Sequence, residues 1–362
     1  MTARDLTREV QEAAAAGIRL HGFRVPPSGR PAALRDCTLV VPTYQRPAEM
    51  VSLLGSLMAI PDPPGEVVVV DGSGGNETHD AVLMWSRAAC APFALSFVMS
   101  PPGLTRQRNV GIDASAGDFI FFLDDDCVPE PGYFQSIRSV YAEDGSRGVG
   151  AVCGSIINAM GKPLTLRWRI RFLLKLVPHG EYGKYYPTAT SVPVGLTKPF
   201  SGVRAVDIMP GGAASYRREV FERHRFSQFF YGYSQGEDME MSLRIGKDWK
   251  LLWCGDAHVL HNHVAGGRPA HFQKGLMEVR NRFFIWKRYS SDAGTADRIR
   301  FWADIAYVFA CDLGGFLTHP LSVGFLSHAA GVVKGAVLCI FSPPHYEEPA
   351  ARREYECVFD GG

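Results

Sequence analysis

The stretch "FIFFLDDDCVPEPG", Phe119–Gly132, decides the fold prediction, because five apolar residues run directly into three consecutive carboxylates. The apolar run has the composition of a strand buried on both faces, as in a parallel sheet. On an extended backbone Asp124 and Asp126 point to one side and Asp125 to the other. Like charges this close repel one another, so we expect a positive group beside them.

Apolar runs and helical segments alternate on both sides of this stretch. The runs "TLVVPT", "EVVVVDG" and "LSFVMS" each precede a longer segment of helical character. This order predicts an α/β fold, Rossmann-like, with a mostly parallel sheet flanked by helices and right-handed crossovers. Ligands of such folds bind at the carboxyl ends of the strands, where Asp71 ends one run and Asp124 to Asp126 follow another.

Composition limits the class of protein. The chain has 362 residues, 46% of them apolar and 21% charged, as in folded globular proteins. A formal charge of +1 gives no broad cationic field, so we expect no nucleic-acid partner. The eight cysteines form no C-x-x-C pair, and the N-terminus has no apolar signal region. We therefore expect a protein of the reducing cytoplasm.

Asp124 and Asp126 form a D-x-D pair. Two carboxylates at a strand end suit a hard divalent cation such as Mg²⁺, which binds one or two carboxylates together with substrate phosphates. The alternative is a solvated acidic loop.

Two further segments place charged residues where a nucleotide could bind. In "VVVVDGSGGNE", Asp71 could accept a hydrogen bond from an imide or a ribose, or lie in a plain turn. In "GLTRQRNVGI", Arg106 and Arg108 lie near a helix N-terminus, where a diphosphate would be favoured. A solvated basic helix face is the alternative there.

Catalytic and further metal-binding candidates come later in the chain. In "GEDMEMSLRIG", Glu237 and Asp238 either stabilise the first turn of a helix or supply a general base. The segment "GDAHVLHNH" contains His258, His261 and His263, and on a strand His261 and His263 would share a face. One of these three imidazoles could complete the coordination of the ion.

The remaining segments leave alternatives open. In residues 162–200, Arg167, Arg171 and Lys175 fit one face of a helix. Arg167, Arg169 and Arg171 also fit the alternation of a strand, so the period alone does not decide between the two. Residues 300–341 are strongly apolar, but only Val323–Phe341 approaches the length of a membrane-spanning helix. We expect C-terminal amphipathic helices that either lie in the plane of a membrane or pack on the main domain.

These motifs, in this order, resemble those of the family 2 glycosyltransferases, which have the GT-A fold and transfer a sugar from a nucleotide sugar to an acceptor hydroxyl. The resemblance covers Cys37–Tyr289 and rests on "VVPTYQRP", "VVVVDGS", "RQRNVGI", "AGDFIFFLDDD", "GGAASYRREVF", "GEDMEMSLR" and "HVLHNH". It implies an inverting, metal-dependent hexosyl- or deoxyhexosyltransferase of polysaccharide or glycolipid biosynthesis.

The resemblance assigns a role to each candidate residue. Asp238 would be the general base, Asp126 the closer metal ligand, His261 the third contact to the metal or diphosphate, and Asp124 the carboxylate nearer the ribose. Donor-binding residues would be Pro42, Thr43, Tyr44, Arg46, Asp71, Arg106, Arg108, Asn109, Asp124 and Asp125. Acceptor-binding residues would be Gly211, Gly212 and Glu237.

The same resemblance defines regions and ligands. We predict an N-terminal extension (1–35), a GT-A domain (36–290) and a C-terminal helical region (291–362). Within the domain, 36–155 would bind the nucleotide sugar and 156–290, with an insert at about 162–200, the acceptor. The cofactor would be Mg²⁺ or Mn²⁺, and Asp71 favours a UDP- or dTDP-sugar. The acceptor would be a glycan or a lipid-linked molecule. Independently of the resemblance, the basic segment Arg167 to Lys175 and the apolar C-terminal helices suggest peripheral contact with the inner membrane face, near such an acceptor.

Two other functions fit parts of the pattern. A metal-dependent nucleotidyltransferase would share the nucleotide, the ion and the sheet, but would carry a glycine-rich basic loop where this chain has "PTYQRP". A non-catalytic nucleotide- or carbohydrate-binding relative would share the fold alone.

Overall fold

The computed structural model describes residues 18–29, 34–180, 182–264, 269–290, 292, 294–344 and 355–361.

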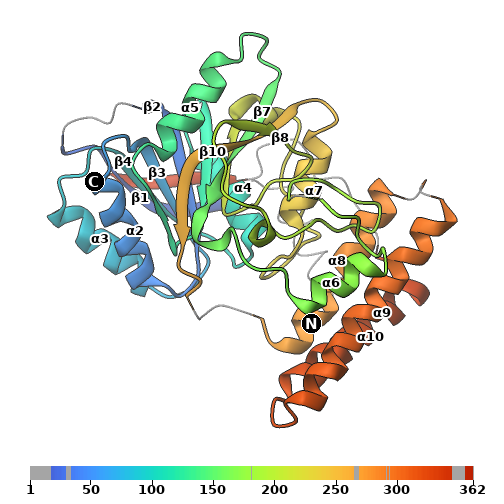
Figure 1. The fold of residues 1–362 in the computed structure, drawn as a ribbon. Helices are drawn as coiled ribbons and strands as arrows, with labels where there is room; N and C mark the ends of the chain where they lie inside the picture. Colours follow the sequence, from blue (N-terminus) through green and yellow to red (C-terminus); the bar gives the residue numbers. More distant parts are fainter. Residues whose placement is uncertain are drawn as a thin grey trace.

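A twisted sheet runs through the molecule with helices on both of its faces, and three long helices form a separate layer at one side (Figure 1). The described strands are β1 (Ile18–Val25), β2 (Leu34–Thr43), β3 (Pro64–Asp71), β4 (Ala94–Met99), β5 (Phe119–Leu123), β6 (Cys127–Pro129), β7 (Val149–Ile156), β8 (Val203–Ala205), β9 (Ala213–Arg217), β10 (Lys250–His261) and β11 (Tyr355–Gly361).

The sheet has the order β11-β1-β4-β3-β2-β5-β9-β7-β10-β6, and β8 pairs with β10. Its centre, β4-β3-β2-β5, is parallel throughout, whereas β9 runs antiparallel to both β5 and β7. The central strands are almost entirely buried, in agreement with their unbroken Val, Ile and Phe content. The predicted mixed α/β fold with a mostly parallel core is confirmed.

The helices divide between the two faces of the sheet. One buried cluster joins the sheet to α2, α3 and α5, and a second joins its other face to α4 and α7. The described α-helices are α2 (Pro47–Ala59), α3 (Glu77–Ala88), α4 (Leu104–Ala114), α5 (Tyr133–Glu143), α6 (Leu166–Leu173), α7 (Glu237–Ile245), α8 (His271–Tyr289), α9 (Thr295–Thr318) and α10 (Gly324–Phe341). Short 3₁₀ helices are η1 (Ile157–Ala159), η2 (Val194–Leu196) and η3 (Arg218–Glu222).

The parallel register brings the predicted polar residues to one edge of the sheet. Thr43, at the end of β2, pairs directly with Asp71 at the end of β3. Strand β5 ends at Leu123, so Asp124 begins the turn at the same edge. The sequence-based expectation of a ligand site at the carboxyl ends of the strands therefore has its geometric basis here.

Two segments outside the predicted GT-A range also join the sheet. Strand β1 pairs with β4, and β11 pairs in parallel with β1 over seven residue pairs. We predicted no strand in either segment, because "IRLHGFRV" and "YECVFDG" are short and mix apolar with charged residues, so periodicity does not distinguish them from loops. The structure therefore adds two strands at this edge of the sheet.

The segment of ambiguous period, within residues 162–200, contains the short helix α6. Its Arg171 is buried and makes a bidentate ion pair with Asp304 of α9, with N–O distances of 2.7 and 3.2 Å. Arg282 of α8 donates to the same carboxylate at 2.7 Å. This three-residue ion cluster joins α6, α8 and α9, and it leaves Arg171 unavailable to a membrane surface.

Helices α9 and α10 form an antiparallel hairpin that packs on α8 (Figure 1). By length and composition alone, both are long and apolar enough to cross a membrane, whereas the sequence pattern singled out α10 only. The sequence pattern did not single out α9 because Asp304 and Asp312 interrupt its apolar run, and both of these residues are buried in the structure.

Candidate functional site

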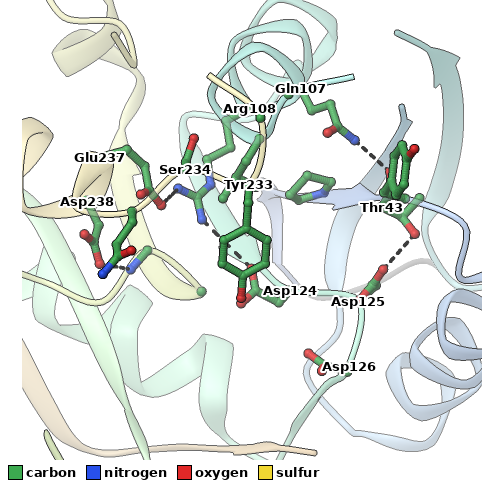
Figure 2. Close-up of a pocket in the computed structure, with 18 of the residues that line it drawn as sticks. Thr43, Gln107, Arg108, Asp124, Asp125, Asp126, Tyr233, Ser234, Glu237 and Asp238 are labelled. Carbon is green, nitrogen blue, oxygen red and sulfur yellow. Dashed lines mark hydrogen bonds and ion pairs between the residues drawn. The ribbon is translucent and has the colours of Figure 1, made fainter. Parts of the chain in front are cut away.

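A cavity of about 710 Å³ opens at the carboxyl edge of the sheet (Figure 2). Its walls come from the end of β2, the start of α4, the turn after β5, the loop before α7 and the end of β10. The predicted site residues that line it are Pro42, Thr43, Tyr44, Arg46, Arg108, Asp124, Asp125, Asp126, Gly211, Gly212, Glu237, Asp238 and His261.

The three consecutive aspartates have different partners. Asp125 is 5% exposed, accepts a hydrogen bond from the Thr43 hydroxyl at 2.8 Å and pairs with Arg46 at 2.7 Å. Burial raises the pKa of Asp125 to about 6, even though Arg46 and Thr43 oppose the shift. Asp125, at the cavity lining, therefore fixes the loop after β2 through Thr43 and Arg46.

Asp126 is surrounded by an imidazole, a backbone N–H and a guanidinium group, all of which favour its ionised form. His261 lies 3.0 Å from its Oδ1, the backbone N–H of Val264 donates to its Oδ2 at 2.9 Å, and Arg46 lies 3.5 Å away. Burial opposes ionisation of this carboxyl, but these groups outweigh burial and lower its pKa. Asp126 is thus held as a carboxylate at the cavity floor.

A group of potential metal ligands surrounds Asp126. One ligand atom from each of Asp124, Asp126, Cys127 and His261 lies within 4.8 Å of all the others. Burial and the three neighbouring carboxylates raise the pKa of the Cys127 thiol well above its usual value, so this thiol stays protonated. The remaining donors, two carboxylates and an imidazole, fit Mn²⁺ or Mg²⁺ better than a thiolate-binding metal.

The start of α7 supplies a second pair of carboxylates. Asp238 accepts hydrogen bonds from the backbone N–H groups of Met239 at 2.7 Å and Gly211 at 3.2 Å. Glu237 is buried and pairs with Arg108 at 2.9 Å. Burial raises the pKa of both carboxyls, and Arg108 offsets this only in part. A buried carboxyl with a raised pKa at the wall of a cavity has the properties of a general base.

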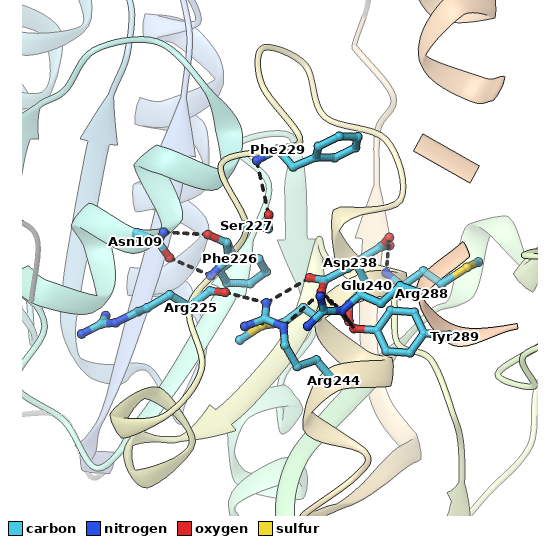
Figure 3. Close-up of polar contacts among 12 residues, drawn as sticks. Asn109, Arg225, Phe226, Ser227, Phe229, Asp238, Glu240, Arg244, Arg288 and Tyr289 are labelled. Atoms are coloured by element: carbon cyan, nitrogen blue, oxygen red, sulfur yellow. Dashed lines mark hydrogen bonds and ion pairs between the residues drawn. The ribbon is translucent and has the colours of Figure 1, made fainter. Parts of the chain in front are cut away.

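A buried network anchors the helix that carries Asp238 (Figure 3). Glu240, two residues further along α7, is fully buried and pairs with Arg244 at 2.9 Å. The Tyr289 hydroxyl at the end of α8 donates to Glu240 at 2.9 Å. Because these contacts fix α7 against α8, they also fix the position from which Asp238 faces the cavity.

Gly211 and Gly212 lie where the backbone meets two charged side chains. A Cβ added at position 212 would collide with the Asp124 carboxylate, and one at 211 would lie 2.8 Å from Arg108 Nη2. Any larger side chain would displace these groups from the cavity. Their predicted contact with an acceptor remains a prediction.

Three predicted residues do not line the cavity. Asp71 is buried, and its Oδ1 accepts hydrogen bonds from the Ser73 backbone N–H and hydroxyl. Arg106 is partly exposed on α4 outside the lining. Asn109 makes two hydrogen bonds of 2.9 Å with the backbone of Phe226 (Figure 3), which joins α4 to the loop before α7.

The loop before α7 contributes residues that the sequence pattern did not single out. Tyr233, 51% exposed, lies at the cavity, and Ser234 and Gln235 line it as well (Figure 2). Gly232 and Gly236 have φ values of 72° and 88°, which favour glycine. The paired glycines are the sequence signal that could have drawn attention to this loop.

The three histidines also separate. His261 and His263 line the cavity with their ring centroids 4.0 Å apart. His258 lies outside the lining, with Nδ1 3.3 Å from Glu130. His261 alone of the three belongs to the group of potential metal ligands around Asp126, within the part of the chain that the structure describes.

The family model described as glycosyl transferase family 2 matches residues 38–225, just over half of the chain. The chain belongs to this family. The match spans the cavity walls from β2 to the loop after β9, and it ends before α7.

Two curated proteins match parts of the chain. Polypeptide N-acetylgalactosaminyltransferase 15 of mouse is 25% identical over 215 residues, 56% of this chain and 32% of the relative. An uncharacterized glycosyltransferase of Haemophilus influenzae is 32% identical over 107 residues, 30% of this chain and 35% of the relative. The chain thus spans about a third of the length of these curated relatives.

Among solved structures, a mannosyltransferase from Pyrobaculum calidifontis in complex with GDP-Man and Mn²⁺ superposes with a TM-score of 0.51. It is 17% identical, and the superposition covers 93% of this chain and 95% of the other. This likeness supports the GT-A fold.

Proposed function

We propose that the protein is a metal-dependent inverting glycosyltransferase, which moves a hexosyl or deoxyhexosyl group from a nucleotide sugar to an acceptor hydroxyl. One observation carries the proposal: Asp124, Asp126 and His261 meet in the same cavity as Asp238, in a chain of glycosyl transferase family 2. Family membership favours glycosyl transfer over nucleotidyl transfer.

Asp124, Asp126 and His261 are the residues that would hold Mn²⁺ or Mg²⁺. A divalent ion bound there supplies positive charge for the diphosphate that leaves the donor. The nucleoside would lie against Thr43 and Arg46, which Asp125 holds in place through their hydrogen bonds to its carboxylate. Asp71, Arg106 and Asn109 lie outside the cavity lining, so their roles toward the donor are the least supported of the set.

Asp238 would accept the proton of the acceptor hydroxyl while that oxygen attacks the anomeric carbon. The nucleoside diphosphate leaves from the opposite side of the carbon, and the configuration inverts in this single displacement. The two N–H donors on Asp238 fix its orientation, and Arg108 holds Glu237 beside it. Gly211 and Gly212 would leave space at the acceptor side.

The donor preference rests on the sequence position of Asp71, and the setting rests on the family and the apolar C-terminal helices. We propose a UDP- or dTDP-sugar as donor, and a glycan or lipid-linked acceptor in polysaccharide or glycolipid biosynthesis. The enzyme would act in the cytoplasm, in peripheral contact with the inner face of the membrane.

The raised pKa of Asp238 predicts the acid side of the pH–rate profile. Below its pKa the carboxyl is protonated and cannot accept the hydroxyl proton, so kcat/KM should rise as the pH rises through that pKa. Because burial raises the pKa above 3.8, this acid limb should lie above pH 3.8. A profile of kcat/KM at saturating Mn²⁺, together with nucleotide binding at each pH, measures it. An acid limb at or below that value would contradict the assignment.

A thermal-shift panel tests the proposed donor site. We expect one of UDP, dTDP, GDP and CDP to raise the Tm of the wild type with Mn²⁺ and not with EDTA, since saturation at 100-fold over Kd stabilises a fold by about 2.7 kcal/mol. Asp126→Ala should lose this shift.

The matched control is Asp80→Ala, which removes an exposed carboxylate of α3 and should keep the shift. A metal-dependent shift without sugar transfer to any acceptor would support the non-catalytic relative. No shift with any nucleotide would refute the donor-site assignment.

A further inference from the structure

From residue 301 onward, the outer face of the α9–α10 hairpin is almost free of charge, whereas the first two turns of α9 expose Arg298 and Arg300. Residues 301–344 are described throughout, and Lys334 is their one exposed residue of the Asp, Glu, Lys and Arg types. Both acidic residues of this range, Asp304 and Asp312, are buried. Asp304 pairs with Arg171 and Arg282, and Asp312 contacts His328 Nδ1 at 2.6 Å. The charged groups thus face α6, α8 and α10, away from the outer face.

Large apolar side chains take the outward positions instead. Exposed apolar residues of the hairpin are Leu313, Leu317, Leu321, Val323, Leu326, Val333, Val337, Ile340 and Phe341. Leu321, in the turn between the helices, is 98% exposed. In the most apolar window of each helix, 28% of the residues are buried within the chain. An apolar surface of this extent on a folded chain marks an interaction site.

The positive side chains on and just after α6, beside the hairpin, indicate which kind of surface would cover the apolar face. Helix α6 lies against α9 through the Arg171–Asp304 pair and a hydrogen bond of 2.9 Å from the Tyr307 hydroxyl to the Arg167 carbonyl. Helix α6 exposes Arg169 together with Leu166 and Leu173, and Lys175, two residues after its end, is exposed as well. The sequence from 162 to 180 contains neither Asp nor Glu. Exposed cations next to exposed leucines, with no carboxylate among them, are complementary to anionic lipid headgroups above acyl chains.

We propose, building on the membrane contact in the proposed function, that the outward face of α6, α9 and α10 is the surface that docks on an anionic lipid bilayer, with the hairpin leucines in the acyl region and Arg169 and Lys175 at the headgroups. The hairpin is firmly attached, because a Cβ at Gly331 of α10 would collide with the backbone of Phe272 in α8. The start of α8 follows Pro269, which lines the cavity. A docked chain therefore holds the cavity close to the membrane surface.

Vesicle flotation of the full chain tests the proposal. The probes are phosphatidylcholine vesicles and vesicles that also contain phosphatidylglycerol. We expect the wild type to float with the anionic vesicles, and Leu317→Glu with Leu321→Glu to weaken binding at least about tenfold. Arg169→Glu with Lys175→Glu should weaken binding to anionic vesicles about fivefold or more per residue. Met84→Glu is the matched control, since Met84 of α3 is 71% exposed outside this surface, and it should bind as the wild type does.

Three results would overturn the proposal: a wild type that floats with neither vesicle, a leucine variant that floats as the wild type does, or a wild-type dimer that the leucine substitutions dissociate without lipid. The last outcome would make the face a protein interface. The Tm of each variant and its nucleotide-dependent shift are measured in parallel. An unchanged nucleotide shift in a variant that no longer floats separates membrane docking from the donor site.

Discussion

Asp238→Asn should lower kcat by about 10²–10⁴-fold while leaving nucleotide binding intact. The asparagine keeps the size of the side chain. Its amide oxygen can still accept one of the two backbone N–H groups, those of Gly211 and Met239, which donate to different oxygens of the carboxylate. What it loses is the ability to take a proton from the acceptor. The loss should therefore fall on the chemical step, which single-turnover transfer measures with donor and acceptor both saturating.

Asp248→Asn is the control for this variant. Asp248 lies just after α7, and its side chain is 51% exposed and contacts His224 at 3.5 Å. The substitution Asp248→Asn removes a carboxylate from the same region, outside the cavity lining, so turnover should stay close to the wild-type value. If Asp238→Asn also kept near-normal turnover, the base would have to be another residue, with Glu237 the nearest candidate.

Asp304→Asn should lower the free energy of unfolding by about 3–5 kcal/mol. Asp304 is fully buried, and it is the shared partner of Arg171 and Arg282. Without its charge, two guanidinium groups stay enclosed with no carboxylate between them. Denaturant unfolding measures the loss, and the nucleotide-dependent thermal shift should survive at temperatures where the variant is folded.

Asp297→Asn provides the comparison on the same helix. Asp297 pairs with Arg300 at 2.8 Å near the start of α9, where both side chains are partly in solvent. Exposed pairs of this kind contribute about 0–1 kcal/mol, so this variant should unfold close to the wild type. Equal losses from the two substitutions would show that burial of the Asp304 cluster adds nothing to stability.

The sequence predicted the parts of the site that are carried by local pattern. An apolar run followed by carboxylates placed Asp124 and Asp126 at the strand end, and "GEDMEM" placed Asp238 in the first turn of a helix. Both predictions depend only on periodicity and on the ends of elements, which are local properties.

Partners distant in the chain were beyond this kind of inference. Asp125 was predicted among the donor-binding residues, but its hydrogen bonds reach Thr43 and Arg46, 82 and 79 residues away. Arg171 appeared as one of several arginines on a helix face, and its partner Asp304 is 133 residues away. No spacing rule distinguishes an arginine that pairs in the core from one that faces solvent, because the choice depends on which helices meet.

The pairing of β11 with β1 has a consequence for how the chain folds. Arg19 and Glu356 form an ion pair across these strands, 337 positions apart in the sequence. During synthesis β1 leaves the ribosome early and can join β4, but its outer edge has no partner until β11 is made. The last strand of the sheet is therefore added only after translation has passed through the whole apolar hairpin. Contacts of such long range form slowly, so this edge is where a nascent chain is exposed to aggregation for the longest time.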